Sequence, residues 1–243
     1  MKVVVTALRV LEEITAGPPM GVSELSRRLE LPKSTVQRAL ETLTAEGWIQ
    51  QEPNGSRHWM QTPKLLVLAS RGGGTALRET ALPVMHQLLS RVNENIHLTI
   101  RHDDNIVVVE RLESTHLVRV FDPLGITIPL HASASGKAIL AHATEAGINE
   151  YISRNLKAYT ADTLTDPDSI REELRDIRSR GYAYNRGEWR SEIKGIGAPI
   201  RDRHGPPYAG LSVSIPHHRL VEKDVEALGA LVVQAAMDIS RAL

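Results

Sequence analysis

The stretch from Gly21 to Met60, GVSELSRRLELPKSTVQRALETLTAEGWIQQEPNGSRHWM, decides the fold of the first part of this chain. It reads as a short helix, a turn around Leu31-Pro32, a second helix and a hairpin. The hairpin is indicated by Asn54-Gly55, a dipeptide that favours the tight turn between two strands. This order of elements predicts a winged helix-turn-helix, whose second helix enters the major groove of DNA while the wing meets the backbone.

The second helix of this stretch carries side chains suited to DNA. We expect Ser34 or Thr35 to cap it, since short polar side chains satisfy the free N–H groups at a helix start. Gln37 and Arg38 are exposed candidates for hydrogen bonds to base edges. Four residues are expected to bind phosphates, which fix position without reading sequence: Lys33, Ser34, Thr35 and Arg57.

The composition is that of an ordinary globular protein. Of 243 residues, 42% are hydrophobic and 24% are charged, and the net charge is zero, so charge alone does not indicate a nucleic-acid partner. The absence of Cys excludes disulfides and thiolate metal sites. No apolar run approaches the roughly 20 residues that span a membrane. Because Glu12 and Glu13 argue against a signal peptide, we expect a cytoplasmic protein without a membrane partner.

We expect two domains joined by a short linker. Residues 1–62 would form the DNA-binding domain, with a first helix over Val3–Ala16 and a second helix capped by Ser23. Residues 63–74 would form a linker helix and a hinge, because Arg71-Gly72-Gly73-Gly74 is the clearest flexible segment. Residues 75–243 would form the second domain.

The second domain alternates helical and strand patterns. Apolar residues recur at helical spacing over 75–93, 135–143, 168–180 and 220–243. Strands are predicted over 96–100, 106–111, 117–121, 182–186, 195–201 and 208–215. Helices packed with mostly antiparallel strands predict an α+β domain.

Small and polar residues cluster in Leu130–Ala138, LHASASGKA, where a helix is predicted to begin. Free N–H groups at a helix start attract anions, so a small carboxylate could bind at Ala134–Ser135. Alternatively, the small residues only let the helix pack closely on the sheet. Ser212 and Ser214 share one face of a strand. They would be ligand donors if that face meets residues 133–136, and surface serines otherwise.

Two other classes of function stay open on the residues alone. The second domain could be an enzyme with His131, Ser133 or Lys137 as its active group, although spacing identifies no nucleophile–base pair. It could also be a dimerisation module without a ligand. The ten His show no spacing of a closed metal site, and Gly136-Lys137 is not part of a P-loop. We therefore expect no metal and no cofactor.

Four segments in the same order resemble the IclR-type bacterial transcriptional regulators: Leu31–Ile49, Asn95–Ser114, Ile128–Ala141 and Gly181–Pro216. The resemblance runs from about Ala7 to the C-terminus. It implies a winged helix-turn-helix, a linker helix and a GAF-like C-terminal domain that binds a small metabolite. It also implies double-stranded operator DNA as a partner, homodimers formed through the DNA-binding domains, and pairing of dimers into tetramers.

The resemblance further implies an effector site. Ser133, Ala134 and Ser135 would form its carboxylate-binding loop, while Ser212 and Ser214 would donate hydrogen bonds. Its apolar wall would consist of Leu117, Val120, Ile128 and Ile193. Relatives often carry an acid where this chain has Asn185 and a Cys where it has Gly195. These departures indicate a ligand larger than, or shaped differently from, the smallest keto acids. The expected function is a metabolite-responsive regulator of a catabolic operon.

Overall fold

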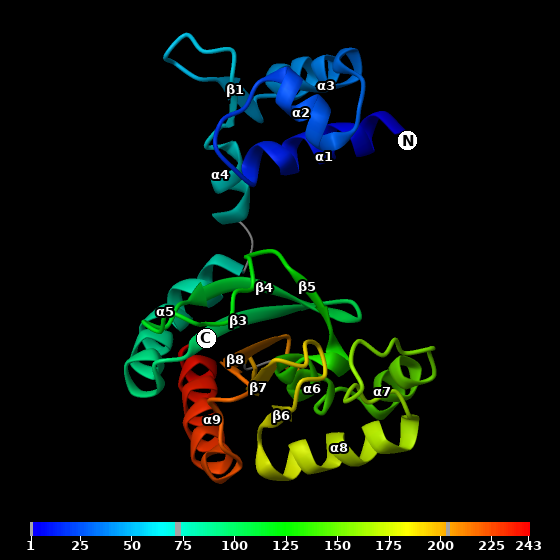
Figure 1. The fold of residues 1–243 in the computed structure, drawn as a ribbon, viewed down its shortest axis with the longest axis vertical. Helices are drawn as coiled ribbons and strands as arrows, with labels where there is room; N and C mark the ends of the chain where they lie inside the picture. Colours follow the sequence, from blue (N-terminus) through cyan, green and yellow to red (C-terminus); the bar gives the residue numbers. More distant parts are fainter. Residues whose placement is uncertain (1, 71–73, 203–204) are drawn as a thin grey trace. The chain divides into compact units, whose positions relative to one another are not determined.

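The computed structural model describes residues 2–70, 74–202 and 205–243. The chain divides into two compact units, Met1–Thr75 and Ala76–Leu243 (Figure 1). No helix within the described ranges is long and apolar enough to cross a membrane. Of the predicted hinge Arg71–Gly74, residues 71–73 lie outside the described residues, and Gly74 begins a helix.

The first unit is a winged helix-turn-helix, as predicted. It consists of α1 (Lys2–Thr15), α2 (Val22–Leu29), α3 (Lys33–Ala45), β1 (Ile49–Gln51), β2 (Trp59–Gln61) and α4 (Lys64–Ser70). The strands pair antiparallel, with Ile49 opposite Gln61. Apolar residues of α1, α2, α3 and the wing form its core, among them Val10, Leu25, Leu40, Ile49 and Trp59. Because this core fixes α3 by one face, the opposite face stays on the surface.

Both predicted helix caps in this unit are wrong. The N-cap of α3 is Pro32, so Ser34 and Thr35 lie inside its first turn. The carbonyl of Pro32 accepts the N–H groups of Thr35 (2.9 Å) and Val36. The fixed φ of proline, here −55°, suits the entry into a helix, so the helix begins two residues earlier than a cap at Ser34 would allow. The N-cap of α2 is likewise Gly21 rather than Ser23.

The second unit is the expected α+β domain. Its strands are β3 (Asn95–His102), β4 (Asn105–Leu112), β5 (Thr127–Pro129), β6 (Ala183–Asn185), β7 (Ile193–Ile200) and β8 (Ala209–Pro216). They form one sheet in the order β5-β4-β3-β8-β7-β6, and every neighbouring pair is antiparallel. Its α-helices are α5 (Gly74–Val92), α6 (Ala134–Leu140), α7 (Glu145–Ile152), α8 (Pro167–Arg180) and α9 (Val225–Ala242). Of these, α7 was not predicted.

Helices cover the two faces of the sheet in separate groups (Figure 1). On one face, α5 and α9 pack against an aliphatic layer that includes Leu98, Leu211 and Val213. The other core contains residues of α6, α7 and α8. Because side chains alternate along a strand, Ser212 and Ser214 lie on the face opposite Leu211 and Val213, where α6 begins.

The strand predicted over Leu117–Phe121 does not form. Its backbone carbonyls are bound by side chains instead of a neighbouring strand: Arg219 donates to Val118 O (3.0 Å), and Asn95 Nδ2 donates to Val120 O. The β-favouring composition is therefore overridden by tertiary hydrogen bonds. The strand that pairs with β4 on this edge is β5.

The start of α6 rests directly on the backbone of the sheet. A Cβ atom built on Gly197 of β7 would lie 2.5 Å from Ser135 N, and one built on Gly210 of β8 would lie 2.8 Å from Ser135 Cβ. Both distances are shorter than any real packing contact, so only glycine allows this approach. Close packing explains the glycines of the sheet and the small residues of α6 together.

Replacing Gly197 by alanine should push α6 away from β7. We expect Gly197→Ala to lower the free energy of unfolding by about 1–3 kcal/mol, the usual cost of overpacking a tight contact. The matched control is Gly205→Ala, whose added Cβ would come no closer than 3.9 Å to another residue. Urea unfolding of both variants measures the difference, and equal stability of the two would contradict the close contact.

Candidate functional site

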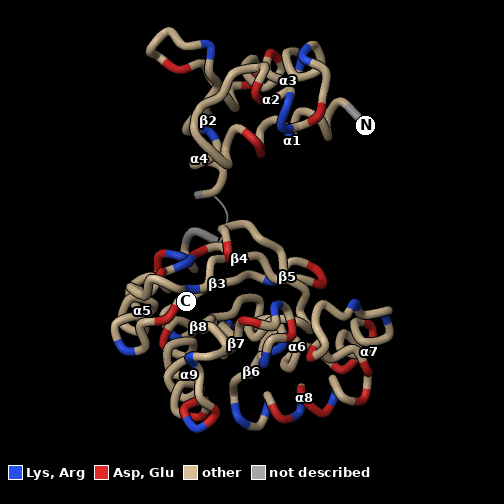
Figure 2. Tube along the Cα trace, viewed as in Figure 1, with Lys and Arg blue, Asp and Glu red and all other residues tan. Residues whose placement is uncertain are grey.

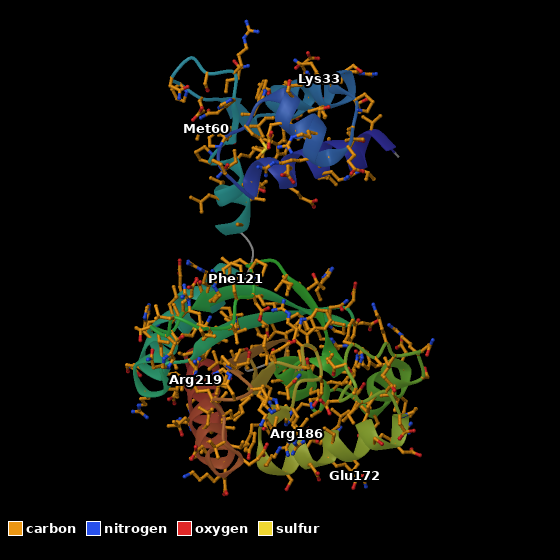
Figure 3. All side chains as sticks on the ribbon, viewed as in Figure 1. Lys33, Met60, Phe121, Glu172, Arg186 and Arg219 are labelled. Carbon is orange, nitrogen blue, oxygen red and sulfur yellow. The ribbon has the colours of Figure 1, made fainter. Side chains whose placement is uncertain are left out.

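The exposed face of α3 carries the predicted DNA-contacting residues. Lys33, Ser34 and Arg38 are exposed, while Thr35 and Gln37 are half-buried. Figure 3 shows Lys33 at the surface of the first unit. The Gln37 amide donates to Glu41 Oε1 at 2.9 Å. Base contact by Gln37 would therefore require this hydrogen bond to be exchanged.

Cations of the first unit differ in whether a carboxylate neutralises them. Arg27 and Arg28 both bind Glu24, which accepts from them at 2.7 Å and 2.8 Å. Within the described residues, Lys33, Arg38 and Arg57 form no ion pair. Both units otherwise mix the two signs of charge (Figure 2). The three cations predicted to contact DNA are thus among those without an acidic partner in the described part of the chain; Arg9 and Lys64 also have none there, but they bind the backbone carbonyls of Leu29 and Glu46.

The wing and α3 share one surface groove. Gln37 of α3 and Arg57 of the wing line it together, with Ser23 and His58 beside them. Arg38 lies outside this groove on the exposed side of α3. The structure therefore brings the helix and the wing residues predicted to contact DNA to one part of the surface.

The second unit contains a pocket where the start of α6 faces β3, β7 and β8. Its empty volume, counted together with its open mouth, is about 510 Å³. Nine of the eleven predicted effector residues line it: Ser133, Ala134, Ser135, Asn185, Gly195, Ser212, Ser214, Ile128 and Ile193. Segments far apart in the sequence thus meet in one cavity.

Leu117 and Val120 do not form the expected apolar wall. The Leu117 side chain is 98% exposed, and Val120 is buried away from the pocket lining. Both belong to the segment that was wrongly predicted as a strand. Ile106 and Val108 of β4 provide apolar lining in their place.

Several predicted site residues use their polar atoms to hold the pocket together. Asn185 donates to Ala132 O at 2.7 Å, and its Oδ1 accepts the N–H groups of Gly187 and Glu188. Ser133 caps α6 by accepting from Gly136 N at 3.1 Å. These two side chains position the loops around the pocket, whereas Ser212 makes no hydrogen bond to any described side chain or backbone group through its hydroxyl.

Eight lining residues were missed in the sequence: besides Ile106 and Val108, they are His97, Thr99, Asp122, Ala132, Trp189 and Arg190. His97 is only 2% exposed, and burial lowers its pKa to about 4, so the imidazole is neutral. Its Nε2 and the Nε1 of Trp189 are buried without a hydrogen-bond partner in the described structure. Asp122 Oδ1 lies 3.0 Å from Arg190 Nη1. Unpaired buried polar atoms are costly, so His97 Nε2 and Trp189 Nε1 each need a water molecule or a ligand group as a partner.

Of the three side chains named as possible active groups of an enzyme, Ser133 lines the pocket, but Lys137 and His131 are bound elsewhere. Lys137 Nζ donates to Glu188 Oε1 at 2.6 Å and to Tyr184 O at 3.0 Å. His131 contacts the Tyr151 hydroxyl through Nδ1 and Lys157 O through Nε2. Neither residue lines the pocket. Among the described residues, no group of three His, Cys, Asp or Glu is arranged to hold a metal ion.

Comparisons with protein families match both units. Residues 3–53 match the IclR helix-turn-helix domain, and residues 73–241 match the C-terminal domain of the bacterial transcriptional regulator IclR. The chain is 30% identical to the transcriptional repressor IclR of Escherichia coli, over 97% of this chain and 87% of the relative. It is 29% identical to the acetate operon repressor of Salmonella typhimurium, over 97% and 87% respectively.

Solved structures share the fold across the whole chain. One is an IclR homologue from Microbacterium hydrocarbonoxydans in complex with 4-hydroxybenzoate, with a TM-score of 0.82, 28% identity, and coverage of 99% of this chain and 98% of that one.

The relatives found are regulators, so the enzyme alternative is set aside. Two family models together span nearly all of the chain, and full-length relatives agree with them. This protein belongs to the IclR family of bacterial transcriptional regulators and carries its helix-turn-helix DNA-binding domain.

Proposed function

We propose that this regulator senses a small carboxylate-bearing metabolite in the pocket of its second unit and thereby controls a catabolic operon. One observation carries the proposal: the pocket is lined by His97 and Trp189, whose buried Nε2 and Nε1 atoms have no hydrogen-bond partner among the described residues. A module that served only for dimerisation would have no use for such a cavity. The operon class is supported by the name of the Salmonella relative, an acetate operon repressor.

A carboxylate fits the donors around this pocket. The first-turn N–H groups of Ala134 and Ser135 have no carbonyl partner four residues earlier in their own helix. Ser212 adds a buried hydroxyl on the facing strand. The ligand of the homologue from Microbacterium, 4-hydroxybenzoate, is itself a small carboxylate. Ala134, Ser135 and Ser212 are therefore the proposed carboxylate-binding residues, with Ile128 and Ile193 as apolar lining.

Ligand binding is tested by thermal unfolding against a panel of small aliphatic and aromatic carboxylates. The best ligand should raise the melting temperature and change the affinity for the protein's own upstream DNA. Ser212→Ala should weaken that ligand about tenfold, since a hydrogen bond to a charged group is lost. Ser153→Ala, an exposed serine outside the pocket, is the control. Tight DNA binding with no response to any ligand would instead favour the ligand-free module.

For DNA recognition, we propose that residues 1–62 bind operator DNA with α3 in the major groove. Gln37 and Arg38 are the proposed base contacts, and Lys33, Ser34, Thr35 and Arg57 the proposed phosphate contacts. The exposure of Arg38 and its lack of an acidic partner within the described residues support this assignment. Residues 63–74 would link this domain to the effector-binding domain, residues 75–243.

Arg38→Ala should lower the preference for operator over unrelated DNA, because a bidentate Arg–guanine contact contributes about 1–3 kcal/mol of discrimination. Lys33→Ala should weaken binding to every sequence alike and reduce the dependence of affinity on salt. Fluorescence anisotropy with operator and scrambled DNA at several salt concentrations separates the two effects. A uniform loss in both variants would refute the assignment of Arg38.

A homodimer is the proposed assembly, formed through α1. Val3, Val4, Val5 and Leu8 are each more than half exposed on this helix, an apolar patch that a monomer rarely leaves in water. A dimer would present two copies of α3 to a palindromic site and double the modest positive charge of the first unit. Pairing of dimers into tetramers is proposed from the family alone.

Placing a charge in this patch should separate the protomers. We expect Val4→Glu to reduce the dimer fraction and, with it, the affinity for a palindromic operator, because an unpaired carboxylate would be buried at the interface. Thr15→Glu adds the same charge to an exposed position near the other end of α1. Light scattering over a concentration series reports the assembly, and an unchanged dimer in Val4→Glu would exclude α1 as the interface.

A further inference from the structure

We propose that His97 and Asp122 together bind a hydroxyl group of the effector, so that the pocket selects a hydroxylated monocarboxylate and rejects a second carboxylate. This inference rests on the proposed sensing function. It adds the chemistry of the ligand's other end, which the carboxylate-binding residues do not determine.

The two side chains face each other across a gap that one oxygen atom would bridge. His97 Nε2 lies 3.9 Å from Asp122 Oδ2, too far for a direct hydrogen bond. Two hydrogen bonds of about 2.8 Å that meet at one oxygen nearly at a right angle span roughly 4 Å. Both side chains are buried, at 2% and 7% exposure, and both line the pocket. A single hydroxyl oxygen therefore fits between them.

Hydrogen-bond roles at His97 make this oxygen both an acceptor and a donor. The Ser214 hydroxyl lies 3.2 Å from His97 Nδ1. If Ser214 donates to Nδ1, the neutral imidazole carries its proton on Nε2, the atom left without a partner in the described structure. An effector hydroxyl then accepts from Nε2–H and donates to Asp122. A keto oxygen would accept from His97 Nε2–H but could not donate to Asp122. A carboxylate would be repelled by the negative charge of Asp122.

Arg190 explains why the charged side chain of Asp122 is tolerated in the pocket. It also explains why Asp122 favours monocarboxylates over dicarboxylates. Arg190 Nη1 lies 3.0 Å from Asp122 Oδ1, although no N–H is aligned for a hydrogen bond there. This ion pair holds Oδ1 of the Asp122 side chain beside Arg190, while Oδ2 can accept a hydrogen bond from the effector. The same contact offsets the positive charge of the guanidinium, so Arg190 attracts a second carboxylate of the ligand less strongly than an arginine without an acidic partner would. Removing Asp122 should strengthen that attraction.

Matched ligand pairs measure the selection directly. Calorimetric titration of the full-length protein would compare 4-hydroxybenzoate with benzoate and 4-hydroxybutyrate with butyrate, and would include terephthalate and succinate as dicarboxylates. In at least one pair, we expect the hydroxylated acid to bind about tenfold more tightly, the effect of one hydrogen bond to a charged group. The dicarboxylates should bind more weakly than either member of that pair.

Asp122→Leu should abolish the preference for the hydroxylated acid. It should also increase the affinity for the corresponding dicarboxylate, because no carboxylate of the protein would then offset the charge of Arg190. Loss of structure alone would weaken all ligands and could not produce this reversal. Glu113→Leu is the matched control, since Glu113 lies on the same connection between β4 and β5 and pairs with Arg111 and Arg119, but does not line the pocket. Asp122→Asn preserves the shape of the side chain, and it should reduce the rejection of dicarboxylates if the leucine variant does not fold.

The outcomes separate this inference from the function on which it rests. Equal affinities within both pairs, together with a ligand-dependent change in DNA affinity, would overturn the hydroxyl site and leave the sensor intact. Binding of none of these acids, with DNA affinity unaffected, would overturn both. A dicarboxylate that binds native protein most tightly would also refute the role of Asp122.

Discussion

The contact between the start of α6 and the backbone of β7 and β8 is the constraint on which the pocket depends. Gly197 and Gly210 leave no side chain between helix and sheet, so Ser135 reaches the strands themselves. This approach places the first turn of α6 beside the polar face of the sheet, where His97, Thr99 and Ser212 lie. A helix held at the usual side-chain distance would leave these groups in separate places.

Sequence patterns predicted the elements whose signals are local. Asn54-Gly55 marked the wing, and Gly55 adopts a positive φ of 80° in the longer loop, residues 52–58, that joins β1 to β2. Alternation along Leu211–Ile215 placed Ser212 and Ser214 on one face, and the structure directs that face toward residues 133–135. The small residues of Leu130–Ala138 were interpreted either as a carboxylate-binding loop or as a surface for close packing on the sheet. Both interpretations are consistent with the structure, because close packing is what brings the start of α6 to the pocket.

The parts that could not be predicted depend on distant contacts. Nothing local shows that Arg219 and Asn95 bind the carbonyls of the 117–121 segment, which is why a strand was expected there. Asp122, Trp189 and Arg190 come from connections between strands whose course is set by such contacts. His97 is different, since it alternates with Ile96 and Leu98 and pairs with Ser212. The period of that strand could have identified it.

Regulation requires the pocket and the DNA-binding surface to influence each other, although they belong to separate compact units. Thermodynamic linkage makes such coupling reciprocal: the factor by which an effector changes operator affinity equals the factor by which operator changes effector affinity. The most direct test is to titrate the effector into the free protein and into its saturated operator complex. Coupling predicts two different dissociation constants, whose ratio matches the change in operator affinity. Identical constants would show that the pocket does not control DNA binding.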